Sequence, residues 1–348
     1  MWLCSNQILK KILLLQVYPH KLPNFLSTSE RDIITVMVGG STEDSEDSYS
    51  LVDPSHSCSI SLDPLPVHNM WDPIVAVVQD QMVACYIDYE HYITWGTKKS
   101  LCWQLRVDTR SRWTPVPSPS QGMFLPTSAV VGEKLLVIGG SLDYTYDIKN
   151  MSGSTLVQEY DIRSRTWAEG TRLPAPLFEG CAVETLLGVI VIGDFEAGNP
   201  NAYILDRSKW KPLPLSNYAH TNPGCALVTI NRKSGVLVIS GSFVEFFSLW
   251  DNKWIKLPKT KVKRKRDIRP TVGMSHGQIV ITGGFDMDSG EVSDIIEVWD
   301  GEEWMWRVAS KRVKGNRIRQ GDVSLPEQYA EAQQGRPRRH VVGPSRLR

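Results

Sequence analysis

Short apolar runs alternate with clusters of turn residues along the chain, and five of these runs end in paired small residues. They are VMVGG (36–40), LLVIGG (135–140), VIVIGD (189–194), LVISG (237–241) and IVITGG (279–284). Continuous β-branched character over so few residues is typical of a strand that is covered on both faces. The glycines permit positive φ or a close approach by a neighbouring side chain. The pattern therefore predicts buried strands that end at tight bends.

A second pattern follows most of these runs: an apolar residue, an aspartate, a few turn residues and a tryptophan. The copies are Val107-Asp108…Trp113, Tyr160-Asp161…Trp167, Leu205-Asp206…Trp210, Trp250-Asp251…Trp254 and Trp299-Asp300…Trp304. Aspartate before turn residues indicates a hairpin, because its side chain can hydrogen-bond the local backbone. The regular place of the tryptophans favours packing between repeats over ligand binding. Recurrence about every 50 residues indicates a repeat architecture.

Each repeat divides into four strands, of which the second is the apolar run. The second strands are expected at 34–40, 81–87, 133–140, 187–193, 235–241 and 278–284. The expected first strands share a column of small residues, which suits strands crowded around a central axis: Ala76, Ala129, Ala182, Ala226 and Gly273. The first repeat has Cys58 in place of its tryptophan, and the second has Tyr86-Ile87 in place of its glycines.

The two ends of the repeat region complement each other. The first repeat starts directly with its second strand at Ile34, and RIRQGDVSLPEQ (317–328) resembles one extra first strand. A C-terminal strand that completes the N-terminal repeat would close a ring and leave no free sheet edge.

The glycine pair after an apolar strand, the aromatic-Asp pair and the tryptophan together resemble the kelch repeat, over about residues 33–328. The resemblance implies an all-β fold, a six-bladed kelch-type β-propeller whose blade 1 is closed by a C-terminal strand. The expected domains are an N-terminal extension (1–30), poorly ordered or packed on the rim, the propeller (31–331) and a disordered basic tail (332–348). No region resembles the F-box or BTB-type domains that often accompany kelch repeats.

Composition changes this picture little. The chain has 348 residues, 41% of them hydrophobic and 22% charged, and a net charge of +1. This balance predicts neither a nucleic-acid partner nor, without an apolar run of about 18 residues, a membrane span. We expect a monomeric propeller. The run ILLLQV (12–17) is shorter than a normal signal-peptide core, which leaves a secreted location open and favours a cytoplasmic one.

The sequence predicts no catalytic, cofactor-binding or metal-binding residue, because its seven histidines lie far apart and its six cysteines lack C-x-x-C spacing. Cys85 and Cys102 bracket a strand connection, where a disulfide can form if the protein is secreted. Cys181 and Cys225 occupy equivalent first-strand positions in neighbouring repeats. We interpret these two as small hydrophobic residues buried near the axis.

Charged and aromatic loops are the candidate chemistry of this chain. Antiparallel order places second-to-third-strand loops and blade connections on one face. That face should carry the acidic loops 41–48 and 286–291, the aromatic loops 88–95 and 142–147, and the basic loop 259–269. The candidate binding residues are Glu43, Asp44, Glu46, Asp47, Tyr89, Tyr92, Trp95, Tyr144, Tyr146, Lys261, Lys263, Arg264, Lys265 and Arg266. The charged loops could instead be solvated and mutually neutralising, or the basic loop a nuclear-localisation signal.

The function implied by the kelch resemblance is non-enzymatic protein–protein interaction, with the propeller as a scaffold that binds a protein or peptide through loops on one face. Two alternatives stay open. One is a propeller enzyme, galactose-oxidase-like or other, that uses the central channel. The other is a secreted lectin-like or adhesive module.

Overall fold

The structure is a computed structural model, and its described regular elements are β-strands. It covers residues 33–38, 49–53, 58–62, 70–78, 81–88, 99–106, 112–143, 151–195, 201–261, 268–275, 278–286, 291–292, 297–301, 303–308 and 321–326. Within these ranges every regular element is a strand, and no helix is present that could cross a membrane.

Three sheets contain the strands from β1 to β11, together with β25 from the end of the described chain, and in each of them neighbouring strands pair antiparallel. One sheet contains β25 (Gly321–Pro326), β1 (Ile33–Val38), β2 (Tyr49–Asp53) and β3 (Cys58–Leu62) in that order. The next contains β4 (Met70–Val78), β5 (Gln81–Asp88), β6 (Ser100–Arg106) and β7 (Thr114–Val116). The third contains β8 (Thr127–Val131), β9 (Lys134–Ile138), β10 (Val157–Asp161) and β11 (Thr166–Glu169).

The later part of the chain forms three more antiparallel sheets with the same strand order. One contains β12 (Leu177–Thr185), β13 (Gly188–Phe195), β14 (Ala202–Asp206) and β15 (Lys209–Pro212). Another contains β16 (Gly224–Ile230), β17 (Lys233–Ser240), β18 (Phe243–Ser248) and β19 (Lys253–Leu257). The last contains β20 (Ile268–Ser275), β21 (Gln278–Asp286), β23 (Glu297–Asp300) and β24 (Met305–Val308), with the short β22 (Glu291–Val292) beside β21.

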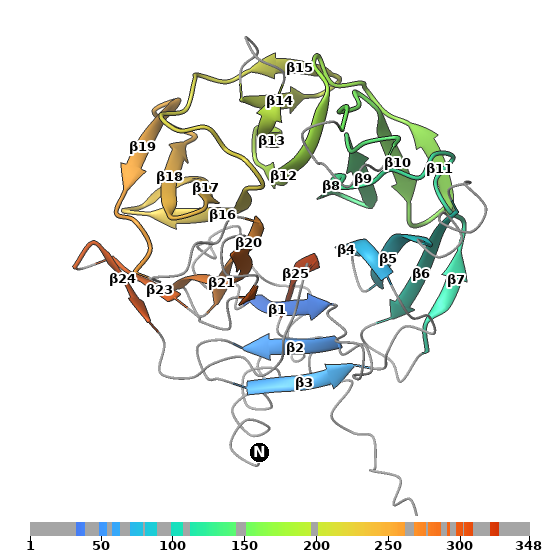
Figure 1. Cartoon of the computed structure of the whole chain (residues 1–348), viewed down its shortest axis with the longest axis horizontal. Helices are drawn as coiled ribbons and strands as arrows, with labels where there is room; N and C mark the ends of the chain where they lie inside the picture. The colour runs from blue at the N-terminus through green and yellow to red at the C-terminus, as the bar shows by residue number, and fades with distance from the viewer. Residues whose placement is uncertain are drawn as a thin grey trace, which may run out of the picture.

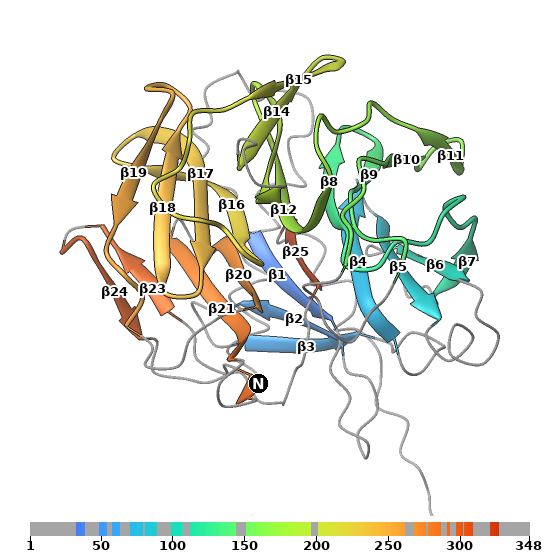
Figure 2. The ribbon, with the colours of Figure 1, turned by 45° about the horizontal axis from the view of Figure 1, so that its top comes forward.

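The sheets stand around a common centre in a β-propeller, with the first strand of each sheet innermost and the last outermost (Figure 1). Tilting the molecule shows the strands of a sheet side by side, as for β16 to β19 (Figure 2). The predicted column of small residues lies on the innermost strands, where Ala129 pairs with Leu136 and Ala226 with Leu237. Small side chains at this column suit strands that crowd around one axis.

The hydrophobic core lies between neighbouring sheets. Along β17, Val236 and Val238 pack with residues of β12–β14, whereas Leu237 and Ile239 pack with residues of β20–β24. A second strand is therefore covered on both faces, which explains why its sequence is continuously apolar.

The glycine pair after β9 is required by backbone conformation and by a close approach. Gly139 and Gly140 have φ of 65° and 87°. A Cβ atom at Gly139 would lie 2.5 Å from the carbonyl oxygen of Leu177 in the neighbouring sheet. The amide of Gly140 donates to that same oxygen at 2.8 Å. The predicted positive φ is confirmed at this glycine pair, and the close neighbour is a backbone carbonyl group in place of the expected side chain.

The segment predicted to add a C-terminal strand contains β25, which pairs antiparallel with β1 from Ile33↔Pro326 to Val38↔Gly321. The innermost strands also contact one another around the centre, with β25 beside both β4 and β20. The last described strand thus lies in the same sheet as the first.

Candidate interaction surface

The face formed by blade connections and second-to-third-strand turns is the candidate site. Of its predicted residues, Lys261 is described and its side chain is exposed. The other predicted residues lie outside the described residues: Glu43, Asp44, Glu46, Asp47, Tyr89, Tyr92, Trp95, Tyr144, Tyr146, Lys263, Arg264, Lys265 and Arg266. The structure of this face is therefore seen in the blade connections and turns that lie within the described ranges.

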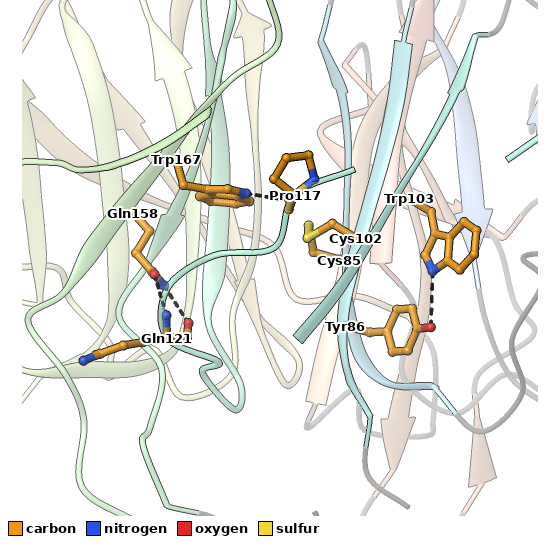
Figure 3. The surroundings of a disulfide bond; sticks show 8 residues. All are labelled: Cys85, Tyr86, Cys102, Trp103, Pro117, Gln121, Gln158 and Trp167. Carbon is orange, nitrogen blue, oxygen red and sulfur yellow. Dashed lines mark hydrogen bonds between the residues drawn. A yellow bond between two sulfur atoms is a disulfide. The ribbon is translucent and has the colours of Figure 1, made fainter. Parts of the chain in front are cut away.

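The repeated tryptophans fix these connections to the next sheet. Each indole Nε1 donates to a backbone carbonyl oxygen of the segment that arrives from the preceding sheet. The pairs are Trp167 with Pro117 (2.8 Å; Figure 3), Trp210 with Thr171 (2.8 Å), Trp254 with Pro214 (2.8 Å) and Trp306 with Pro258 (3.1 Å). The predicted role in packing between blades is confirmed, and the contact includes a specific hydrogen bond.

Strand register corrects three assignments within the repeat. Trp299 pairs with Trp306, as Tyr160 pairs with Trp167, so the tryptophan of the last repeat is the fully buried Trp306. Trp304, which the spacing suggested, lies in the preceding turn with φ of 54°. The predicted position was wrong because Trp304 lies inside the turn between the paired residues Asp300 and Met305, whereas the shorter turn between Asp206 and Lys209 places Trp210, four residues after its aspartate, in the strand.

The other two corrections concern the fifth and first repeats. In the fifth repeat Phe247 pairs with Trp254, and Trp250-Asp251 falls in the turn beyond Ser248, where Trp250 is 81% exposed. In the first repeat Val52 pairs with Ser59, so Ser59 rather than Cys58 stands at the tryptophan position. In the fifth repeat the aspartate before the tryptophan was used to infer the strand pairing, and in the first repeat Cys58 was used. In both, the observed pairing differs from that inference.

In three sheets, a buried polar side chain on the third strand accepts a hydrogen bond from the backbone of a blade connection. Gln158, Glu245 and Glu297 occupy the same register position, opposite Val137, Val238 and Ile281. Their side-chain oxygens accept the backbone N–H of Gln121 (3.1 Å; Figure 3), Asn217 (3.1 Å) and Lys261 (2.6 Å) in turn. Buried acceptors with matched donors fix a loop in one conformation.

The connection between β15 and β16 is held most extensively. Asn201 donates from Nδ2 to the hydroxyl of Ser216 and to the carbonyl oxygen of Tyr218. The hydroxyl of Ser240 donates to the carbonyl oxygen of Thr221 at 2.7 Å. Both side chains belong to neighbouring strands or their ends, so residues 213–223 form a rigid part of the face.

Glu245 is fully buried beneath this connection. His220 Nε2 lies 3.2 Å from its Oε2, and the backbone amide and side-chain amide of Asn217 both donate to its Oε1. Burial alone would raise the pKa of Glu245, but His220 and Asn217 outweigh it and hold that pKa below its usual range. The charged carboxylate is therefore stable in the folded protein and serves to anchor the loop.

Above this support lies a group of residues that we call the lysine–aromatic patch: Leu215, Tyr218, Phe243, Lys256 and Lys259. Tyr218 is half-buried and the other four are exposed. The rings of Tyr218 and Phe243 lie 4.5 Å apart. Lys256 Nζ lies 5.0 Å from the Tyr218 ring centroid, and Lys259 Nζ lies 4.3 Å from that of Phe243. Leu215 is 73% exposed. Cation–π contacts thus hold two ammonium groups at the surface.

Sequence reasoning missed this patch, apart from Lys259 as part of the basic loop 259–269. Its members come from two connections, the β17–β18 turn and the end of β19. None of them stands in a conspicuous run. The one usable signal was the exposed register of Lys256 in WIKLP (254–258), which places a cation beside the basic loop.

Both disulfide-forming pairs lie in the described sheets. Cys85 and Cys102 are directly paired on β5 and β6, with Cα atoms 4.1 Å apart (Figure 3). Cys181 on β12 is bonded to Cys225 on β16, with Cα atoms 5.9 Å apart. The first pairing confirms the predicted disulfide. The second corrects the interpretation of Cys181 and Cys225 as plain hydrophobic residues: equivalent places on adjacent innermost strands bring the two sulfurs into bonding range.

Tyr86, which stands where other repeats have glycine, is neutral and buried near the first disulfide. Its hydroxyl oxygen accepts from Trp103 Nε1 at 3.3 Å (Figure 3). Burial raises the pKa of Tyr86 to about 12. The side chain therefore fills a structural position and does not ionise near neutral pH.

The opposite face, formed by first-to-second and third-to-fourth turns, has a cavity of about 580 Å³ between two sheets. Asn231, Gln278, Trp299, Asp300 and Arg307 are among its lining residues. The Arg307 guanidinium bonds Asp300 at 2.7 Å and also Glu303. Among the residues that the structure describes, no group of three His, Cys, Asp or Glu side chains is placed to hold a metal ion.

Comparisons with known proteins agree with this architecture. Residues 122–174 match the family model of the kelch motif. Kelch-like protein 21 of Homo sapiens is 39% identical over 70 residues, which are 20% of this chain and 11% of that protein. An F-box/kelch-repeat protein of Arabidopsis thaliana is 26% identical over 113 residues, 32% of this chain and 27% of that protein.

The chain therefore spans about a tenth and about a quarter of the lengths of these two relatives. Among solved structures, that of YjhT has a TM-score of 0.55 and 16% sequence identity, covering 73% of this chain and 87% of that one. The likeness concerns the fold. The chain thus has a β-propeller fold that contains a kelch motif at residues 122–174, and it is similar to kelch-repeat proteins.

Proposed function

We propose that this chain is a non-enzymatic interaction module, which binds a protein or peptide partner through the face formed by its blade connections. The observation that carries the proposal is the rigid mounting of exposed groups on that face. Leu215 is exposed on a connection whose backbone is bonded by Glu245 and Trp254. Lys259 is exposed on a connection whose backbone is bonded by Glu297 and Trp306. Preformed surfaces of this kind lose little conformational entropy on binding.

We further propose that the scaffold is a six-bladed propeller over residues 31–331, with β25 closing blade 1. The strand orders of the six sheets and the β1–β25 pairing support this reading. Residues 1–30 and 332–348 are then extensions outside the propeller. The acidic, aromatic and basic loops named from the sequence are proposed to extend the binding face.

A secreted adhesive module is the second candidate, and the two disulfides favour it. Disulfides persist in oxidising compartments and are rare in the cytosol. In this case the face and its mode of binding would be the same, and the partner would be extracellular.

Affinity purification with the full chain as bait tests the interaction proposal. Replacing Lys261, Lys263, Arg264, Lys265 and Arg266 with glutamine should reduce recovery of the captured partners while the thermal unfolding midpoint is preserved. The matched control replaces five exposed basic residues at turns of the opposite face: Arg165, Arg207, Lys209, Arg232 and Lys253. Equal recovery by both variants would count against this face as the binding surface.

A further inference from the structure

The lysine–aromatic patch carries positive charge that has no counter-ion in the described structure. Lys256 and Lys259 are exposed, and within the ranges described neither forms an ion pair. Near the turns of the opposite face, three lysines bond a carboxylate: Lys134 with Glu159, Lys211 with Asp206 and Lys233 with Asp251. Lys209 and Lys253 at those turns are exposed and, like the patch lysines, form no ion pair among the described residues. What distinguishes the patch lysines is that their unpaired ammonium groups are held beside the contacting rings of Tyr218 and Phe243.

The patch also offers apolar surface beside this charge. Leu215 is 73% and Phe243 38% exposed, although both belong to segments whose backbones are hydrogen-bonded to neighbouring elements. The preceding residue, Pro214, accepts the Trp254 indole hydrogen bond, and the next, Ser216, is bonded by Asn201. Leu215 is therefore presented to solvent by a fixed loop.

We propose that the lysine–aromatic patch binds an acidic peptide segment that carries one apolar anchor residue. This inference rests on the proposed function and names the chemistry of the partner. Carboxylates of the peptide bond the ammonium groups of Lys256 and Lys259, each of which keeps N–H donors free on the side away from the ring. The anchor packs on Leu215 and the exposed edge of Phe243. The sequence continues the positive charge through Lys261 to Arg266.

The ring geometry favours a peptide over a single-stranded nucleic acid. Nucleic-acid bases bind basic surfaces by stacking on open aromatic faces. Here Lys256 covers a face of Tyr218 and Lys259 a face of Phe243, and the two rings also contact each other. Carboxylates can reach the ammonium groups without displacing them from the rings.

Selection of a phage-displayed random peptide library on the immobilised full chain tests the proposal. Enriched sequences should be rich in Asp and Glu around one aromatic or aliphatic residue. A labelled synthetic copy is then titrated by fluorescence anisotropy. Lys256→Gln/Lys259→Gln and Leu215→Ser should each weaken binding by about tenfold or more, and the first should also reduce its salt dependence. Matched controls on the opposite face are Lys209→Gln/Lys253→Gln and Leu186→Ser, where Leu186 is 92% exposed.

The outcomes separate this inference from the function on which it rests. Enriched peptides that lack acidic residues, or that bind the patch variants as well as wild type, would overturn the acidic-peptide site and leave peptide binding in place. No enrichment above an unrelated protein, together with no captured partner, would overturn both. Binding of a labelled oligouridylate that is lost in the same lysine variant would assign the patch to nucleic acid instead.

Discussion

Single side chains in this protein act chiefly by fixing backbone that belongs to another repeat. Four tryptophans donate to carbonyl oxygens of the preceding connection, and three buried polar side chains accept amides from connections. A buried amide or carboxylate without a partner costs about 1–3 kcal/mol, which applies most directly to the contacts of Gln158, Glu245 and Glu297. The indole bonds of Trp167, Trp210 and Trp254 lie nearer the solvent, so each contributes the smaller net energy of an ordinary hydrogen bond. The repeated motif therefore encodes contacts between sheets as much as the shape of one sheet.

Trp254→Phe should isolate the contribution of one such hydrogen bond. Phenylalanine keeps an aromatic ring next to Phe247 but removes the N–H that bonds Pro214 at 2.8 Å. We expect the free energy of unfolding to fall by about 1–2 kcal/mol in urea titrations. Trp250→Phe is the matched control, because Trp250 is 81% exposed and its replacement should change stability by less than about 0.5 kcal/mol. Equal effects of the two replacements would argue against the hydrogen bond as the source.

Strands and turns show what could be predicted from the sequence and what could not. Second strands were predictable because burial on both faces leaves a continuous apolar run, as in β17 and β21. Register was not, because turns between third and fourth strands differ in length: 207–208 join β14 to β15, whereas 249–252 join β18 to β19. A one-dimensional motif cannot distinguish Trp304 in a turn from Trp306 in the strand.

The lysine–aromatic patch escaped prediction for a related reason. Tyr218, Phe243 and Lys256 are separated in sequence and come together only when the β15–β16 connection lies against strands β18 and β19. Each residue alone is an ordinary surface position. Predicting such a site requires the register of β18 against β19 and the path of the connection, which depend on side-chain packing between sheets.

The Cys181–Cys225 disulfide should stabilise the folded protein more than the Cys85–Cys102 disulfide does. It joins innermost strands of adjacent sheets and spans a sequence separation of 44, compared with 17 for Cys85–Cys102. Loop-closure entropy predicts about 4 kcal/mol for the longer loop and about 3 kcal/mol for the shorter one. Urea unfolding of Cys181→Ala/Cys225→Ala and of Cys85→Ala/Cys102→Ala measures both losses. Wild-type protein reduced with dithiothreitol should lose at least as much as either variant, and an unchanged midpoint after verified reduction would contradict the prediction.

The whole molecule depends on contacts that pass from each sheet to the next around a centre. The described core clusters lie between neighbouring sheets from β4–β7 to β20–β24, so none of these sheets buries both of its faces alone. An arrangement of this kind exposes two apolar faces wherever the ring is interrupted. The pairing of β25 with β1 is consequently expected to stabilise all the sheets and not only the first.

Two truncations test this dependence. Deleting residues 321–348 removes β25 and should give a protein that aggregates or unfolds without a cooperative transition. Deleting residues 332–348 removes the proposed tail alone and should leave the unfolding midpoint within about 2 °C of wild type, since exposed termini contribute little. Circular dichroism melts and gel filtration compare the two. A cooperative, monomeric product from the longer deletion would show that the pairing is dispensable.

The pairing of β1 with β25 also sets an order of events during synthesis. A ribosome releases β1 to β3 before β4 to β24, but the strand that completes their sheet emerges after all of these. Until then β1 has an unpaired edge while the later sheets form, and an unpaired strand edge can pair with other chains. Nascent chains of this protein are therefore expected to need protection by chaperones until translation has passed residue 326.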